Sequence, residues 1–366
     1  MPNQTLKCQN LIGVGNGAIA PFSQEKPATQ AGAGTSYDEK FVLFDDDTDL
    51  PLANTEYAIR RESGHLEYGV TDAEGRTHLL AATVAAECGH DVTLFDSLDA
   101  IGGQFRIAMQ IPGKEEFAET IRYFGRKLEV TGVKLVLGQR VTRAHLLAGG
   151  FDDVIVATGV KVRMPPIDGV THPMVLSYVD VLQGKAPVGK RVAIVGAGGI
   201  GFDVGEYLLH DPAHPLPLPV AAWASEWGVD LAATTRGGLV APSVPSPLRQ
   251  IWLMQRKTSK PGAGLGKTSG WVHRATLARN GVVMMAGVQY DRIDDRGLHI
   301  TIGGEQRLIE CDNVVICAGQ ESLTELMPLE GESGGPAFHK IGGAALAAEL
   351  DATRAIREGA ELGARL

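Results

Sequence analysis

The spacing of apolar and polar positions changes along the chain at about Leu79. Before it, residues 41–72 carry short alternating apolar runs separated by turn residues, which is typical of a small β-rich meander. After it, helical stretches alternate with short apolar runs. The pattern predicts helices over 79–88, 114–131, 199–209 and 347–361, and strands over 91–96, 133–137, 153–157, 191–195, 250–255 and 314–317. Because strands and helices interleave, we expect an α/β fold of parallel, doubly wound units.

The first 40 residues differ from the rest of the chain in composition. They are rich in Gly, Ala, Ser, Gln and Asn, a composition that predicts a flexible segment. The opening MPNQTLKCQN has neither the basic nor the apolar region of a secretory signal. No apolar run approaches the ~18–20 residues of a membrane span. We therefore expect a soluble, cytoplasmic protein with no membrane partner.

Composition narrows the possible functions. Apolar residues make up 44% and charged residues 21%, close to an ordinary globular protein, while glycine, with 46 residues, is enriched as in chains with many tight βα turns. The net charge of −9 argues against wholesale binding of nucleic acid. Four scattered cysteines predict neither a disulfide framework nor a metal site: Cys8, Cys88, Cys311 and Cys317.

Charge is distributed unevenly along the chain. Residues 1–86 hold 6 basic and 12 acidic side chains, whereas residues 231–290 hold eight basic and no acidic ones. A solvated face normally mixes both signs. Sixty residues without a carboxylate favour a site for a polyanion, most simply a phosphorylated cofactor. A basic surface that arose by chance is the alternative.

The run KRVAIVGAGGIG at 190–201 joins a predicted strand to a predicted helix through a GxGxxG turn. Gly196 would make the tight turn, Gly198, with Gly199 beside it, would let the backbone approach a pyrophosphate, and Gly201 would allow the helix to pack closely on the strand. The helix N-terminus would then face the phosphates. The sequence predicts dinucleotide binding here; an ordinary glycine-rich turn is the alternative.

The end of the next predicted strand bears on which dinucleotide binds. In an NAD site an acidic residue at this point holds the ribose 2′-hydroxyl. Here the strand at 250–255 ends in Arg256 and Lys257, with Lys260 just beyond. Cations suit a 2′-phosphate, so NADPH is favoured over NADH. Gly201 and Arg256 lie much farther apart than the ~20 residues of the simple motif, so an insertion must intervene.

A second nucleotide-binding unit is present in part. The strand in GHDVTLFD ends in Asp96, which is well placed for a ribose hydroxyl, and Gly103 and Gln104 follow shortly after it. An acid that simply ends a strand is the alternative interpretation. Two further apolar strands run into Ala157-Thr158-Gly159 and Ala318-Gly319, as in flavoproteins with two nucleotide-binding domains.

From about Leu79 to Leu366 the chain resembles the FAD/NADPH half of bacterial 2,4-dienoyl-CoA reductase, an Old Yellow Enzyme-type iron–sulfur flavoprotein of fatty acid β-oxidation. The residues that carry the resemblance are GHDVTLFD, IGGQF, IPGKEEF, VAIVGAGGIGFD, EWGVD, QRKTSKPGAGLGKTSGW, VVICAGQE and ELDATRAI. It implies an NADPH-binding domain over 188–314 inserted into an FAD-binding domain over 79–187 and 315–366.

The resemblance also implies site residues. Arg256, Lys257 and Lys260 would hold the NADPH 2′-phosphate, and Trp271 would lie against the flavin. The expected FAD-binding residues are Asp96, Gly103, Gln104, Val141, Ala157, Thr158, Gly159, Trp271, Gly319 and Gly343. No catalytic acid or base is expected, since hydride transfer depends on positioning. His273 and His90 are more typical of packed or capping histidines.

The sequence also departs from that family. Its first glycine loop would fall on Ala73–His78, where only Gly75 remains, and Gly342-Gly343 is followed by two alanines instead of an aspartate. The family's barrel is missing, so neither FMN nor an iron–sulfur cluster is expected. Residues 1–78, with the β-rich module at 41–78, weakly resemble the C-terminal extension of type VI secretion spike proteins, which implies a possible spike partner.

These observations predict an NADPH-dependent FAD oxidoreductase module whose electron acceptor stays open. Two alternatives belong to other classes. One is a secretion-spike adaptor that carries the enzymatic half as cargo. The other is a pseudo-enzyme that binds NADPH but no flavin.

Overall fold

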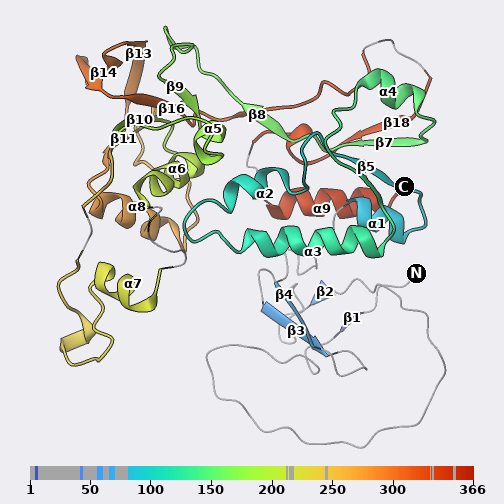
Figure 1. Ribbon diagram of the computed structural model, residues 1–366, viewed down its shortest axis with the longest axis horizontal. Helices are drawn as coiled ribbons and strands as arrows, with labels where there is room; N and C mark the ends of the chain where they lie inside the picture. Colours follow the sequence, from blue (N-terminus) through green and yellow to red (C-terminus); the bar gives the residue numbers. More distant parts are fainter. Residues whose placement is uncertain are drawn as a thin grey trace, which may run out of the picture. The chain divides into compact units, whose positions relative to one another are not determined.

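The computed structural model describes most of the chain from residue 81 onward (Figure 1). The described residues are 5–6, 42–43, 56–60, 66–70, 81–211, 213, 218–243, 246–329, 331, 334–348 and 352–366. They fall into two compact units, one of residues 1–91 with 351–366 and one of residues 92–350. The glycine-poor loop predicted at Ala73–His78 lies outside the described residues.

The described residues of the first unit form four short strands and two helices. Strand β1 (Thr5–Leu6) pairs in parallel with β2 (Val42–Leu43), and β3 (Glu56–Arg60) pairs antiparallel with β4 (Leu66–Val70). The antiparallel pair falls within the predicted β-rich meander. The rest of the predicted flexible segment, and most of the stretch that resembles spike proteins, lie outside the described residues.

Helices α1 (Ala81–Glu87) and α9 (Ala352–Gly363) pack against each other within the first unit. Glycines allow this close approach: a Cβ on Gly363 would lie 2.7 Å from the Ala81 carbonyl oxygen. The predicted helix at 347–361 begins too early, because α9 starts at Ala352. The described residues 347–348 lie outside any helix and follow a short 3₁₀ turn, η3 (Gly342–Ala344), whose residues are buried.

A five-stranded parallel sheet forms the centre of the second unit. Its strand order is β12-β11-β10-β16-β9. The strands are β9 (Val175–Ser177), β10 (Arg191–Val195), β11 (Gln250–Met254), β12 (Val283–Met285) and β16 (Asn313–Ile316). In the register, Val192 lies between Ile251 and Asn313. Because all strands are parallel, their carboxyl ends meet at one edge, where nucleotide sites form in such folds.

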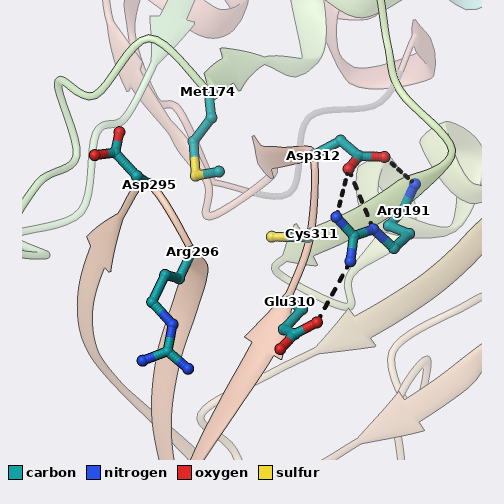
Figure 2. A pocket seen from close by; sticks show the side chains of 7 residues that line it. All are labelled: Met174, Arg191, Asp295, Arg296, Glu310, Cys311 and Asp312. Carbon is teal, nitrogen blue, oxygen red and sulfur yellow. Dashed lines mark hydrogen bonds and ion pairs between the residues drawn. The ribbon is translucent and has the colours of Figure 1, made fainter.

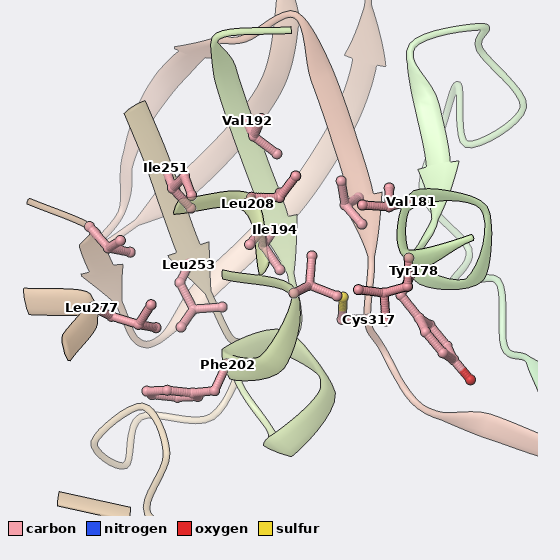
Figure 3. Close-up of a cluster of buried hydrophobic side chains, with 14 of the residues drawn as sticks. Tyr178, Val181, Val192, Ile194, Phe202, Leu208, Ile251, Leu253, Leu277 and Cys317 are labelled. Atoms are coloured by element: carbon pink, nitrogen blue, oxygen red, sulfur yellow. The ribbon is translucent and has the colours of Figure 1, made fainter. Parts of the chain in front are cut away.

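Helices cover one face of this sheet, as Figure 3 shows. Ile194 and Leu253 point toward Phe202 of α6 (Gly199–Leu209) and Leu277 of α8 (Gly270–Arg279). Tyr178 of α5 (Tyr178–Leu182) belongs to the same cluster. Each of these side chains is at most 3% exposed, so the strand and the helix that flank the glycine turn are firmly held.

A three-stranded antiparallel sheet, instead of a second layer of helices, supplies the packing partners on the other face. It consists of β13 (Val288–Asp294), β14 (Gly297–Ile302) and β15 (Glu305–Glu310). Ala193 and Val195, which alternate with Val192 and Ile194 along β10, pack with Leu298 and Ile300 of this sheet. The pattern of apolar and polar positions did not predict these strands.

The remaining strands of the second unit form three separate pairs. Strand β5 (Thr93–Phe95) pairs in parallel with β6 (Lys134–Val136), and β7 (Asp153–Val156) with β18 (Ala337–Lys340); β8 (Val160–Val162) and β17 (Gln320–Ser322) are antiparallel. Helices α2 (Gly103–Ala108), α3 (Phe117–Val130) and α4 (Arg143–Ala148) connect them. Among the described residues, no strand joins β5 to β7.

A loop-rich insertion follows α6. It contains α7 (Val220–Trp227), where Trp223 stacks on Trp227, and a 3₁₀ turn, η2 (Arg236–Gly238). The long gap between Gly201 and Arg256 predicted an insertion here. None of the helices in the described part of the chain is long and apolar enough to cross a membrane.

Candidate functional site

Two glycines of the turn between β10 and α6 are required by packing. Gly196 has φ +116°, a conformation that favours glycine, and its N–H donates to the Met254 carbonyl oxygen at 2.8 Å. A Cβ on Gly196 would press on the Cys317 carbonyl. A Cβ on Gly201 would press on the Gly196 carbonyl and lie 3.2 Å from a methyl group of Leu253. These two positions therefore hold the turn against the sheet.

The two glycines between them face open space. Gly198 is the extended N-cap of α6, and Gly199 is the first residue of that helix. A Cβ on either would meet no atom within 4 Å. Packing within the protein does not demand glycine there, whereas the approach of a bulky anion to the N–H groups of the first helical turn does. The turn is thus open to solvent at these two positions.

Three cations follow the neighbouring strand β11 at the same edge of the sheet. Arg256, Lys257 and Lys260 are exposed, and in the described part of the chain their side chains take part in no hydrogen bond or ion pair. The Gln255 side chain donates to the Lys257 carbonyl at 3.1 Å and to the Ser259 carbonyl at 2.6 Å. This bracing presents three free positive charges on an ordered loop, as a phosphate site requires.

The other basic residues of 231–290 divide into two groups. Arg249 donates to two backbone carbonyls, Arg274 donates to the Gly262 carbonyl, and Arg279 lies over the Trp227 ring at 4.3 Å. These three therefore stabilise the fold. Arg236 and Lys267 are exposed. The acid-free stretch thus combines structural arginines with a compact cationic loop.

The predicted flavin residues near the start of the second unit are accessible. Asp96 directly follows β5, and one oxygen of its carboxylate accepts the Leu98 N–H at 2.9 Å. Gly103 and Gln104 begin α2 and are exposed. Val141 packs at the edge of a small core cluster with Leu146. Their FAD contacts stay a prediction.

The structure brings the predicted turn after β7 and Gly343 together. Ala157, Thr158 and Gly159 follow β7; Thr158 donates to the Leu323 carbonyl at 2.6 Å, and a Cβ on Gly343 would lie 3.1 Å from the Gly159 carbonyl carbon. Gly343 is therefore explained by packing alone. Gly319, with φ +100°, follows β16 beside the Arg163 guanidinium, and Trp271 is 58% exposed on α8.

Helix α6 carries two acidic side chains that the sequence reading passed over. Asp203 accepts from Lys114 at 2.7 Å, and Glu206 bonds His273 Nδ1 on α8 at 2.8 Å. Glu206 is 9% exposed, and burial raises the pKa of its carboxyl although His273 opposes that rise. Two acidic residues three positions apart in an otherwise apolar helix are the sequence feature that could have identified them. The bond to Glu206 agrees with a packed His273.

The described cysteines do not form a redox disulfide. Cys88 is exposed and free; Cys311 and Cys317 are free and buried. The latter two flank β16, and six residue steps of extended chain separate their Cα atoms by ~20 Å, far beyond disulfide reach. Burial raises the pKa of the Cys311 thiol to about 11 and also raises the pKa of the Cys317 thiol, so both are poor nucleophiles.

A pocket of about 350 Å³ lies at the amino ends of the central strands, opposite to the glycine turn (Figure 2). Its charges largely neutralise one another. Arg191 donates to Asp312 at 2.8 Å and lies 3.5 Å from Glu310, as the dashed lines show. The ion pairs hold the strand ends in place, and nothing in them selects a phosphate. In the described part of the chain, no group of acidic, histidine or cysteine side chains has the geometry of a metal site.

Comparison with known proteins identifies the family. Residues 79–351 match the family described as pyridine nucleotide-disulphide oxidoreductase. The chain is 26% identical over 265 residues to a metal reductase of Desulforamulus reducens, an alignment that covers 69% of this chain and 37% of that protein. The chain therefore spans little more than a third of this relative's length.

Two solved structures have the same fold. A 2-naphthoyl-CoA reductase in complex with 2-naphthoyl-CoA is 26% identical, with a TM-score of 0.63 over 78% of this chain and 38% of that one. The thioredoxin reductase of T. acidophilum is 16% identical, with a TM-score of 0.50 over 77% of this chain and 91% of that one. The expected α/β fold with Rossmann-like nucleotide-binding domains is confirmed.

Proposed function

Because the chain belongs to the pyridine nucleotide-disulphide oxidoreductase family, we propose that it binds NADPH at the turn between β10 and α6 and delivers a hydride from it to FAD. Members of this family bind FAD and a nicotinamide nucleotide, and the relatives are reductases.

One observation carries the proposal. The open positions at Gly198 and Gly199 and the free cations at Arg256 and Lys257 lie at the same edge of one sheet, on adjacent strands. The first pair would admit the pyrophosphate, and the second would bind the 2′-phosphate through charge-assisted hydrogen bonds. These residues hold and orient the nucleotide, whose nicotinamide supplies the hydride when it is bound.

The part of the chain that is expected to bind FAD provides fewer of the expected binding residues. Asp96 offers a carboxylate for a ribose hydroxyl, and the exposed Gly103 and Gln104 would approach the same nucleotide. Among the described residues, β5–β6 and β7–β18 remain separate pairs. This arrangement favours a second candidate function, an NADPH-binding protein that retains no flavin. The absorbance spectrum of the purified protein separates the two candidates, because only the first is yellow.

We further propose a specific relation to 2,4-dienoyl-CoA reductase. Its supports are the motifs that include QRKTSKPGAGLGKTSGW and the likeness to a reductase solved with 2-naphthoyl-CoA. Since the chain spans 38% of that reductase, we assign to it only the NADPH-oxidising half of such a reaction.

Calorimetric titration with NADPH and NADH tests the nucleotide assignment. In the double variant Arg256→Ala/Lys257→Ala, two charge-assisted bonds of ~1.5–3 kcal/mol each are lost, so NADPH should bind about a hundredfold or more weakly. NADH, which lacks the 2′-phosphate, should lose less than about threefold.

Arg296→Ala is the matched control. Arg296 is equally exposed but lies in the turn between β13 and β14, at the opposite edge of the sheet. Its removal should leave both affinities unchanged. Equal losses for NADPH and NADH in the double variant would overturn the assignment of the 2′-phosphate to these two residues.

A further inference from the structure

Tyr290 lies beneath the proposed nucleotide turn. It is the third residue of β13, and it packs against a buried cluster that includes Val195, Met254 and Ile316, the last residues of three central strands. Just before it, the Val288 N–H donates to the Gln255 carbonyl at 3.0 Å. The backbone of β13 is thus fixed to the segment that carries the free cations.

The hydroxyl of Tyr290 is buried and has no hydrogen-bond partner within the described chain. The N–H of Gly196 is close by, but it donates to the Met254 carbonyl at 2.8 Å. Leaving a buried hydroxyl unpaired destabilises a folded protein, so its presence calls for an explanation. Phenylalanine would fill the same space without that cost.

The surroundings keep this hydroxyl protonated. Burial raises the pKa of Tyr290 well above its usual value, although the charge of Arg256 and the Gly196 N–H act in the opposite direction. At neutral pH the group is a phenol with a proton to donate, and the described part of the chain places no acceptor against it. A ligand that enters this end of the sheet would supply that acceptor.

We propose that the Tyr290 hydroxyl donates a hydrogen bond to a phosphate oxygen of the bound dinucleotide. The inference rests on the proposed function, because the nucleotide supplies the acceptor. Arg256 is exposed and close enough for its charge to act on this hydroxyl, so both groups would face the same phosphate. The Tyr290 hydroxyl is then a hydrogen-bond donor that gains its acceptor when the nucleotide binds.

The variant Tyr290→Phe gives two effects of opposite sign. Removal of an unpaired hydroxyl should leave the melting temperature of the unliganded protein the same or higher. Loss of a hydrogen bond to a charged phosphate should weaken NADPH binding about tenfold. A purely structural hydroxyl would not produce this combination.

Tyr178→Phe is the matched control. The Tyr178 hydroxyl already accepts from the Gln320 side chain at 2.6 Å in the unliganded protein. Its removal should lower the melting temperature and leave NADPH affinity unchanged. NADH identifies the phosphate: a loss confined to NADPH assigns the bond to the 2′-phosphate, and equal losses assign it to the pyrophosphate.

Unchanged affinity for both nucleotides in Tyr290→Phe would overturn the inference while leaving the proposed function intact. A lower melting temperature with unchanged affinity would show a structural hydroxyl and overturn it as well. Failure of the unaltered protein to bind NADPH would remove the proposed function and the inference together.

Discussion

Glu206 is a residue whose charge the fold tolerates poorly. Its carboxyl bonds His273, and Asp203 with its partner Lys114 lies one helical turn away. Burial is the largest influence and raises the pKa of Glu206 above its usual value, so the folded protein binds this proton more tightly than the unfolded chain does. The corresponding stability is present below about pH 4.5 and is lost as pH rises through the raised pKa.

We therefore predict that Glu206→Gln, which keeps a partner for His273 without the charge, gains stability relative to the unaltered protein as pH rises from about 4 to 7.5. Melting temperatures measured across that range give the difference at each pH. Glu305→Gln, at an exposed carboxylate paired with Arg307, is the control and should show little trend. A difference that shrinks with rising pH would contradict the burial argument.

The glycines of the turn allow a comparison of two identical changes. Gly198→Ala should fold normally, because its extended backbone suits alanine and the new methyl meets no atom. The methyl would occupy the space that a pyrophosphate must approach, so NADPH should bind at least about tenfold more weakly. Thermal melting and calorimetry on the same sample measure both effects.

For Gly201→Ala we expect the opposite pattern, with the main loss in folding stability instead of NADPH affinity. Its methyl would press on the Gly196 carbonyl and on Leu253, and overpacking of this kind costs ~1–3 kcal/mol of folding stability. A variant at Gly198 that melts like the one at Gly201 would show that packing, and not ligand access, explains both glycines.

At the scale of elements, the contact between α1 and α9 depends on the absence of side chains. Gly363→Val should lower the stability of this helix pair by ~1–3 kcal/mol, because its Cβ would lie 2.7 Å from the Ala81 carbonyl and 3.1 Å from the Ala85 nitrogen. Hydrogen exchange of the amides of α1 reads out the loss locally. Ala364→Val, at the exposed end that follows α9, is the control.

The elements that the sequence predicted best are those whose signal is local. The strand at 191–195 and the helix at 199–209 were located to the residue, because a short buried apolar run meets a glycine turn there. The antiparallel sheet at 288–310 was missed, since charged residues interrupt its alternation. Its hairpin signal was present in Gly303-Gly304, both with positive φ.

The residues of the candidate site also divide into those with a local sequence signal and those without one. The glycine turn and the cationic loop follow from residue type and spacing along the chain. Tyr290 and Glu206 matter through what folding places beside them, Gly196 in one case and His273 in the other. A tyrosine in a strand carries no sign in the sequence that its hydroxyl will be left without a partner.

At the scale of the whole molecule, we predict that this chain alone oxidises NADPH without reducing 2,4-dienoyl-CoA thioesters. The resembled family relays electrons to a second flavin in a domain that this chain does not match. With added flavin and an artificial dye, NADPH oxidation should proceed; with a dienoyl-CoA as sole acceptor under anaerobic conditions, it should not.

The protein with Arg256→Ala and Lys257→Ala controls for dye reduction that does not use the nucleotide site. It should lose the dye activity with NADPH. Stoichiometric formation of an enoyl-CoA product by the unaltered chain would contradict the prediction and would require a thioester site within it.

The separate strand pairs of the second unit have a consequence for how the protein behaves in solution. Among the described residues, β5 and β7 each bond to a single neighbouring strand, so the other side of each carries a row of backbone donors and acceptors with no strand to receive them. Such rows are templates for the addition of a strand from another chain, and natural sheets normally shield them. Leu135 and Leu137, more than a third exposed beside β5, add apolar surface to that edge region. Self-association at high concentration should therefore begin at this pair, while the inner strands of the central sheet, β11, β10 and β16, which are paired on both sides, stay intact.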